Sequence, residues 1–306
     1  MALADKVGGE IISVDSMQVY RGLDIGTAKP SAVERARVPH HLIDVVELTE
    51  PFDAAKFVTL AKQAAAAIQS RGRVPIFCGG TGLYFKAYLE GLGEAPPADE
   101  KLRGELEATP LAELLCELEQ RDPATFAVID QENPRRVIRA IEVIRLTNKP
   151  FSAQRAEWMP SASAYSQLAS PQPSHLLGGV RQSDALPEPS FFCLSRATVD
   201  LHARINARVD EMFAAGLVEE VRDLLKRGLE QNRTALQAIG YRQLVEHLRG
   251  ERSLRETIEL VKTKTRQFAK RQLTWFRKYA NAEWIELQPN AAPDEIGKQL
   301  SERGCV

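Results

Sequence analysis

Two polar segments at the ends of apolar runs have the residue types that binding or catalysis needs. Asp15 directly follows the run Glu10–Val14, and an aspartate beyond the carboxyl end of a buried strand can hold a cation or take a proton. A turn that begins with Gly79 and Gly80 follows the run Val74–Cys78, and its glycines would let backbone N–H groups approach a phosphate. The alternatives are a helix cap for the aspartate and a close-packed turn for the glycines, and position alone does not separate them.

A third candidate is the loop Gly22–Pro30, in which Thr27 and Lys29 accompany two glycines. A hydroxyl, a lysine and backbone N–H groups in a short loop could wrap an anion. Most loops of this composition are only turns, so the loop by itself is weak evidence for a binding site.

The most basic part of the sequence lies near its carboxyl end. Between Ser253 and Lys278 there are eight Lys or Arg residues and two Glu residues, in a chain whose net charge is −1. On a helical wheel the cations form two stripes, and an apolar arc that includes Val261, Phe268 and Trp275 lies between them. We expect the arc to be core. A solvated face is the usual explanation of such stripes, but the excess of positive charge favours contact with nucleic-acid phosphates.

A smaller basic cluster lies in the middle of the chain. Arg135, Arg136 and Arg139 share one face of a predicted helix. They could contact phosphates, or they could pair with Glu132 or Glu142.

These segments need elements that position them, and the N-terminal third alternates strand and helix signals. Asp53 can cap a helix over 54–70. Short apolar runs predict strands over 10–14, 42–48 and 74–78. This βαβ pattern predicts a doubly wound α/β core.

The pattern changes from residue 99 onward. Asn133 followed by Pro134 is a favourable helix start, and helices are predicted over 101–121 and 134–147 with no strand between them. Later elements are a strand over 190–195, helices over 199–215, 218–227 and 254–279, and a strand over 284–287. We therefore assign residues 1–98 and 190–306 to an α/β core, residues 99–159 to a helical insertion, and residues 160–189 to a Pro- and Ser-rich loop.

Composition excludes several classes of protein. The 306 residues include 40 Lys or Arg and 41 Asp or Glu, which excludes a uniformly basic nucleic-acid coat protein. No apolar run is long enough to span a membrane and no signal peptide is evident, so we expect a cytoplasmic protein, with a monomer as the default. The four cysteines match no CxxC spacing, and we expect Cys78 and Cys193 to be reduced and buried.

Taken together, these segments resemble the tRNA dimethylallyltransferase family, the isopentenyltransferases that act on tRNA. The resemblance runs from about Gly9 to Leu287. It rests on ISVDSMQVYRGLDIGTAKP, HHLIDV, GGTGLYFKAYLEGL, NPRRVIRAIEV, LHARINARVDEMFAAGL, AIGYRQL and AKRQLTWFRK. It implies a P-loop NTPase-like parallel sheet flanked by helices, with an inserted all-helical tRNA-binding domain.

The family transfers a dimethylallyl group from dimethylallyl diphosphate to the exocyclic N6 of the adenosine beside the anticodon. The N6 lone pair is delocalised into the purine, so a base must take the N6 proton, and the resemblance gives that role to Asp15. It also implies that Arg204 reaches the diphosphate and that Thr81 lines the reaction channel. Gly79 and Gly80 would add N–H donors to the diphosphate. Mg²⁺ is the implied cofactor, held between diphosphate oxygens and the protein.

The implied partner is tRNA, through its anticodon stem-loop, and the target adenosine must leave the anticodon stack. The basic helix would follow the phosphates and the insertion would grip the stem. The alternatives are a small-molecule P-loop kinase and a non-catalytic tRNA-binding protein. The residues implied to contact tRNA are Asp15, Ser16, Met17 and Gln18; Arg135, Arg136, Val137, Ile138 and Arg139; Gln237, Tyr241, Arg242 and Gln243; and Arg266, Lys270 and Arg271 of the basic helix.

The sequence departs from the family pattern in one respect. The family has a strand and a P-loop before the segment EIISVDS, and no G-x-x-x-x-G-K-[ST] motif occurs in this sequence. We expect either that the reading frame extends upstream by about twenty residues, which we favour, or that the chain is truncated. Without that loop and its contact to Mg²⁺, we expect impaired folding and little activity. We also expect Ile11, Ile12 and Val14 to be exposed beside the missing strand.

Overall fold

The computed structural model describes residues 1–92, 96–156, 190–279 and 282–304. The chain forms two compact units. The first contains Met1–Lys86 and the segment from Ala169 to the carboxyl end, and the second contains Ala87–Leu168. The loop predicted over 160–189 lies outside the described residues. Among the described residues, no helix is both long and apolar enough to cross a membrane.

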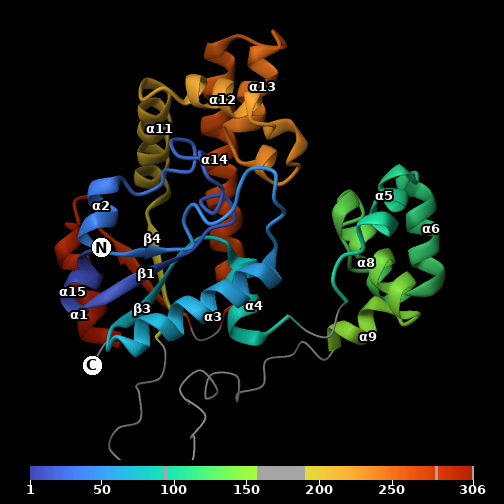
Figure 1. Ribbon diagram of the computed structural model, residues 1–306, viewed down its shortest axis with the longest axis horizontal. Coiled ribbons are helices and arrows are strands. Elements are labelled where there is room, and N and C mark those ends of the chain that lie inside the picture. Colours follow the sequence, from blue (N-terminus) through green and yellow to red (C-terminus); the bar gives the residue numbers. More distant parts are fainter. Residues whose placement is uncertain (93–95, 157–189, 280–281, 305–306) are drawn as a thin grey trace, which may run out of the picture. The chain divides into compact units, whose positions relative to one another are not determined.

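A three-stranded parallel sheet carries the amino-terminal part of the first unit (Figure 1). Ile11 of its middle strand pairs with His40 on one side and Ile76 on the other. All residues of that strand are buried, as expected for an apolar run inside a parallel sheet. The strands in spatial order are β2 (His40–His41), β1 (Gly9–Val14) and β3 (Val74–Gly79), and a separate parallel pair is formed by β4 (Phe192–Arg196) and β5 (Glu283–Leu287).

Two groups of helices belong to the first unit (Figure 1). Near the three-stranded sheet, α3 packs against β1 and β3, and α1 packs against α15. In the second group, α14 packs against α11 and α13. The bounds are α1 (Ala2–Val7), α2 (Ala32–Arg37), α3 (Ala54–Ser70), α4 (Gly82–Glu90), α11 (Thr198–Ala214), α12 (Leu217–Lys226), α13 (Tyr241–Leu248), α14 (Leu254–Phe276) and α15 (Pro293–Gly304), with 3₁₀ turns at Leu229–Gln231 and Ala235–Gln237.

The predicted strand over 42–48 is wrong, and the strand in this region is the two-residue β2. Leu42 and Asp44 have left-handed backbone conformations, with φ of 62° and 56°, which interrupt a strand. The carboxylate of Asp44 accepts hydrogen bonds from Lys29 and Arg35, which stabilise this turn. Tertiary contacts therefore override the apolar pattern here.

The expected exposure of Ile11, Ile12 and Val14 is also wrong. All three side chains are buried, because β1 is the middle strand of its sheet. Exposed apolar side chains occur instead on outer strands, at Val74 of β3 and Leu194 of β4. The exposed apolar side chains therefore lie on β3 and β4 rather than on β1.

The cysteines on strands differ in burial. Cys193 of β4 is buried, which confirms the prediction. Cys78 of β3 is exposed, and the prediction for it is wrong. The apolar run around Cys78 lies on an outer strand, so its outward-facing residues are not covered on both faces.

The second unit is all helical in its described part. Its core contains Leu114, Val137 and Ile141. The single helix predicted over 101–121 is two helices, because Pro110 has no N–H to continue the first and stands as N-cap of the second. The bounds are α5 (Glu100–Ala108), α6 (Leu111–Arg121), α7 (Pro123–Phe126), α8 (Pro134–Thr147) and α9 (Phe151–Ala156).

Two predicted helix starts are confirmed. The side chain of Asp53 accepts a hydrogen bond from the backbone N–H of Lys56 and caps α3. Asn133 caps α8 in the same way, and Pro134 occupies the first helical position. These signals depend on residues within one helical turn of each other, so they do not depend on the rest of the fold.

Candidate functional site

Asp15 directly follows β1, at the carboxyl end of the strand. Its Oδ1 accepts hydrogen bonds from the backbone N–H groups of Met17 (2.7 Å) and Gln18 (3.1 Å). The aspartate therefore caps the turn that follows it. The residue is half-buried, and its second oxygen, Oδ2, accepts no hydrogen bond from the described part of the chain. One oxygen is thus fixed while the other is available to a ligand.

The glycine turn after β3 lies against this segment. Thr81 Oγ1 accepts a hydrogen bond from the backbone N–H of Ser16 at 3.2 Å. The backbone N–H of Thr81 donates to the carbonyl oxygen of Val14, also at 3.2 Å. Because β1 and β3 are parallel neighbours, the two polar segments lie side by side at the same edge of the sheet.

Close packing accounts for the glycines of this turn. A Cβ on Gly79 would lie 2.2 Å from a backbone oxygen of β1. A Cβ on Gly80 would lie 1.9 Å from the amide nitrogen of Gln272, and one on Gly82 would lie 2.1 Å from the ring of Trp275. The Gln272 side chain, from α14, also donates to the carbonyl oxygen of Gly80 at 3.1 Å. The close-packed alternative therefore holds for these glycines.

The loop Gly22–Pro30 does wrap an anion, and the anion belongs to the chain itself. Glu220, in the first turn of α12, accepts hydrogen bonds from the backbone N–H groups of residues 24–26 at 2.7–3.4 Å. The hydroxyl of Tyr241 donates to the same carboxylate at 2.6 Å. Sequence reasoning missed Glu220, because a glutamate in the first turn of a helix is already explained by the helix dipole.

Lys29 is part of the same folded loop. Its side chain is only 3% exposed. Its Nζ donates to the carbonyl oxygen of Tyr20 (2.6 Å) and to the carboxylates of Asp24 (2.8 Å) and Asp44 (2.5 Å). The lysine holds the loop together and is not presented to an external anion.

Arg204 lies on α11 and contacts neither Asp15 nor Thr81. Its Nε donates to the carboxylate of Asp200 at 3.2 Å, and its Nη2 donates to the carbonyl oxygen of Pro289 at 2.5 Å. Its side chain is half exposed. Since a guanidinium has five N–H donors, these bonds leave donors for a ligand.

Helix α14 contacts both the glycine turn and α11, the helix that carries Arg204. Gln272 reaches the glycine turn, and Arg266 donates to the side-chain oxygen of Asn206 on α11 at 2.6 Å. Six residues along a helix span about 9 Å. The glycine turn and the helix that carries Arg204 are therefore attached to neighbouring turns of α14.

The cations of α14 differ in availability. Lys262 pairs with Asp210 (2.8 Å) and Glu259 (3.1 Å), and hydrogen bonds from these carboxylates raise its pKa. Arg266 is bonded to Asn206. Several others are exposed and have no ion pair within the described ranges: Lys264, Lys270, Arg271, Arg277 and Lys278.

The apolar arc of α14 is only partly core. Val261 is buried, and Trp275 is half-buried against the glycine turn. Phe268 is 41% exposed, so its predicted burial is wrong. Neighbouring elements leave this turn of the helix partly open, and the guanidinium of Arg271 lies 5.7 Å from the centre of the Phe268 ring. The ring is therefore an exposed aromatic group among cations.

The basic cluster of the second unit is engaged within that unit. Arg139 donates to the buried carboxylate of Glu142 at 2.8 Å and to the carbonyl oxygen of Pro96 at 2.7 Å. Arg136 lies 3.6 Å from the carboxylate of Asp130. The pairing alternative is therefore confirmed for Arg139.

Val137 and Ile138, between these arginines, lie in the hydrophobic core of the second unit. The prediction that they contact tRNA is wrong for their side chains. Their apolar character is explained by packing against α5 and α6.

The residues around α13 also separate into two groups. Tyr241 is fully buried, so its predicted contact with tRNA is wrong for its side chain. Gln243 accepts the backbone N–H of Gly240 and thereby caps α13. Gln237 and Arg242 are exposed, and their contact with tRNA stays a prediction.

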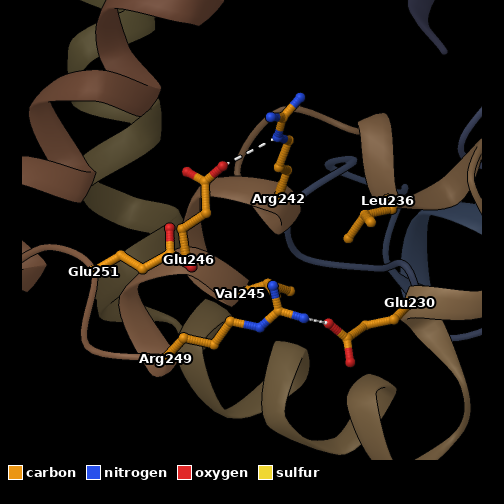
Figure 2. A pocket seen from close by; sticks show the side chains of 7 residues that line it. All are labelled: Glu230, Leu236, Arg242, Val245, Glu246, Arg249 and Glu251. Atoms are coloured by element: carbon orange, nitrogen blue, oxygen red, sulfur yellow. Dashed lines mark hydrogen bonds and ion pairs between the residues drawn. The ribbon is translucent and has the colours of Figure 1, made fainter.

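Arg242 lines a cavity of about 540 Å³ (Figure 2). Figure 2 shows its guanidinium bonded to Glu246, and Arg249 paired with Glu230 on the other side. Glu251 is a third carboxylate in the lining. Three carboxylates against two guanidinium groups do not favour a phosphate, and the lining includes neither Asp15 nor the glycine turn.

Metal ligands do not gather in the described ranges. No three His, Cys, Asp or Glu side chains there are placed so that they could hold a metal ion. Mg²⁺ needs several oxygen ligands in a near-octahedral arrangement. Within the described ranges the chain therefore supplies no cluster of three such ligands, and a Mg²⁺ bound here would complete its shell with water and phosphate oxygens.

The chain is similar to known proteins over most of its length. A family model described as IPP transferase matches residues 18–279. The tRNA dimethylallyltransferase 1 of Trichlorobacter lovleyi is 45% identical over 294 residues, which cover 95% of this chain and 89% of that protein. The tRNA dimethylallyltransferase of Geobacillus thermodenitrificans is 45% identical over 293 residues, covering 94% and 85%.

Solved structures give the same result. The tRNA isopentenylpyrophosphate transferase from Bacillus halodurans superposes with a TM-score of 0.65 at 37% identity, covering 98% of this chain and 88% of that one. A eukaryotic dimethylallyltransferase acting on tRNA superposes with a TM-score of 0.75 at 25% identity, covering 98% and 73%.

Proposed function

The chain belongs to the IPP transferase family, and we propose that it transfers a dimethylallyl group from dimethylallyl diphosphate to N6 of the adenosine beside the anticodon of tRNA. One observation carries the proposal. Asp15 stands at the carboxyl edge of the parallel sheet, fixed by one oxygen and joined through Ser16 to Thr81, with its other oxygen unoccupied by the described chain.

Asp15 is the proposed base. As the C–N bond forms between N6 and the allylic carbon, the bond between that carbon and the diphosphate oxygen breaks. The N6 proton passes to Oδ2 of Asp15, and diphosphate leaves. A positioned base contributes roughly 10²–10⁴ in rate. The hydrogen bonds from Met17 and Gln18 to Oδ1 keep the carboxylate oriented without occupying Oδ2.

Arg204 is the proposed partner of the leaving diphosphate. Its Nη1 donates to no group in the described part of the chain, while Nε and Nη2 are held by Asp200 and Pro289. A guanidinium oriented in this way presents N–H donors to charge that develops on a leaving group. Mg²⁺ would arrive with the diphosphate and offset its charge.

The exposed cations of α14 are the proposed surface for tRNA phosphates. In a chain of net charge −1 they form a local excess of positive charge without carboxylate partners in the described ranges. Such a surface releases counterions when it binds nucleic acid, so affinity falls steeply with salt. We also propose that the protein is cytoplasmic and acts as a monomer. Size-exclusion chromatography with light scattering would test the monomeric state.

The decisive experiment is transfer of labelled dimethylallyl groups to an anticodon stem-loop, with nucleoside mass spectrometry as the readout. Because the sequence contains no P-loop motif, the 306-residue chain is assayed beside a version extended by any in-frame upstream codons. Asp15→Asn should lower kcat about 10²- to 10⁴-fold. The matched control is Asp223→Asn, an exposed aspartate that pairs with Lys226. Turnover of Asp15→Asn within a few-fold of the parent would exclude the role of base.

A further inference from the structure

The carboxylate of Glu220 is surrounded by donors that carry no net charge. The backbone N–H groups of residues 24–26 converge on it from one side, and the hydroxyl of Tyr241 meets it from the other. No Lys, Arg or His in the described chain forms an ion pair with it. A carboxylate held by oriented N–H groups makes stronger hydrogen bonds than a neutral acceptor would. Glu220 therefore fixes the loop backbone most firmly at Ile25, whose nitrogen lies 2.7 Å from the carboxylate, with longer contacts at Asp24 and Gly26.

The packing around this carboxylate is close. A Cβ on Gly26 would lie 2.5 Å from the ring of Tyr241, so the ring rests directly on the loop backbone. Tyr241 is fully buried. Helices α12 and α13 thus hold the loop at one point through Glu220 and Tyr241.

The loop in turn holds the segment that contains Asp15. The amide nitrogen of the Gln18 side chain donates to the carbonyl oxygen of Thr27 at 3.1 Å. Its side-chain oxygen accepts a hydrogen bond from Ser13 Oγ at 2.9 Å. The backbone N–H of Gln18 donates to Oδ1 of Asp15. Gln18 therefore joins the loop, the end of β1 and the aspartate in one series of hydrogen bonds.

We infer that Glu220 is a positioning residue for Asp15, acting through residues 24–28 and Gln18. The inference rests on the proposed function for its catalytic meaning, but the mechanical connection stands on the contacts alone. Glu220 touches no reacting atom. Its part is to keep the loop in the conformation that holds the Gln18 side chain, and with it the orientation of the Asp15 carboxylate.

Hydrogen exchange followed by mass spectrometry tests the connection without any turnover. Glu220→Gln replaces a charged acceptor with a neutral amide of the same shape. Exchange at residues 24–26 should then accelerate about 10- to 100-fold, the factor expected for a hydrogen bond to a charged group. Exchange at Met17 and Gln18 should accelerate with it. The matched control is Glu219→Gln. Glu219 is the neighbouring glutamate, it pairs with exposed Arg222, and its replacement should change neither segment.

Faster exchange at residues 24–26 with unchanged exchange at residues 17 and 18 would overturn the inference, because the loop would then move without the aspartate. Unchanged exchange in both segments would overturn it as well. If Glu220→Gln only unfolds the protein, Tyr241→Phe removes one of the donors to the carboxylate and should give the same pattern at smaller amplitude.

Turnover supplies a readout that a general loss of stability would not produce. Glu220→Gln should lower kcat about tenfold and leave the KM for the stem-loop within twofold. In an Asp15→Asn background the same change should have no further effect, because two residues that act in series are not additive. Additive losses would overturn the inference. If the parent protein has no transferase activity, the proposed function is wrong. The exchange experiment would still test the connection between Glu220 and Asp15.

Discussion

Helices α8 and α14 look alike in the sequence, since each carries a run of basic residues, but the fold uses the two runs differently. On α8, Arg139 neutralises the buried carboxylate of Glu142. On α14, the exposed cations after Lys262 have no carboxylate partner in the described ranges. Whether a basic residue is available to a ligand therefore depends on which carboxylates the fold places beside it. The charge count of the segment does not decide it.

The strongest test of this difference is the removal of Glu142. Its side chain is fully buried and accepts hydrogen bonds from Arg103 and Arg139, and from the backbone N–H of Asp99. Glu142→Ala leaves these donors without an acceptor and should destabilise the second unit by about 3–5 kcal/mol. Hydrogen exchange of the full chain, read over residues 96–150, measures the loss.

The control for Glu142→Ala is Glu132→Ala, an exposed glutamate just before α8. It should change the free energy of unfolding by no more than about 0.5 kcal/mol. Equal effects of the two changes would show that the α8 arginines are not structural.

Acid should loosen the second unit for the same reason. Hydrogen bonds from Arg145 lower the pKa of Glu117, against a smaller opposing effect of burial. Burial alone would raise the pKa of Asp122, but hydrogen bonds from Thr125 and Ser152 outweigh it, so that pKa is also lowered. A carboxylate with a lowered folded-state pKa stabilises the protein above its ordinary pKa, and this stability is lost as pH falls through the lowered value.

Hydrogen exchange over the second unit, followed between pH 7 and pH 3, measures this pH dependence of stability. Glu117→Gln should make the plot of stability against pH flatter, since one titrating group is removed. An unchanged curve would show that Glu117 does not couple folding to protonation.

Removal of exposed cations from α14 should have a smaller effect, and it should change tRNA binding and not stability. The triple change Lys264→Ala, Lys270→Ala and Arg271→Ala should reduce the magnitude of the slope of log affinity against log salt by about 2 to 3, since each phosphate contact contributes roughly 0.7–0.9. The melting temperature should not move. The control is Arg222→Ala with Lys226→Ala, two exposed cations of α12 that already pair with carboxylates. If the triple variant has the same salt slope as the parent protein, this face of α14 is not the phosphate surface.

The smallest effect should come from Phe268. Its exposed ring could stack on an unpaired base, so Phe268→Ala should weaken stem-loop binding about tenfold. Its salt slope should not change, because a ring contacts no phosphate. Phe268→Tyr should retain binding, and a control at exposed Val199 should have no effect. If the slope falls along with the affinity, the ring acts by orienting Arg271 and not by stacking.

The sequence was sufficient where a signal and its consequence are close together along the chain. The caps at Asp53 and Asn133 were predicted for that reason. The rule that parallel strands end at a common edge also pointed to Asp15 as a site. Prediction from the sequence failed where residues distant along the chain determine the backbone conformation. At residues 42–48 the backbone is turned by the bonds of Asp44 to Lys29 and Arg35. The role of Glu220 was not predicted, because the loop residues that it binds lie 194–196 residues away.

The contact between Gly82 and Trp275 limits how this corner of the molecule can change. The indole ring occupies the volume that any side chain at position 82 would need. The pair therefore shares one fixed space, so a larger residue at one position demands a smaller one at the other. Reshaping the turn that contains Thr81, by evolution or by design, therefore requires a smaller residue at position 275 before position 82 can accept a side chain.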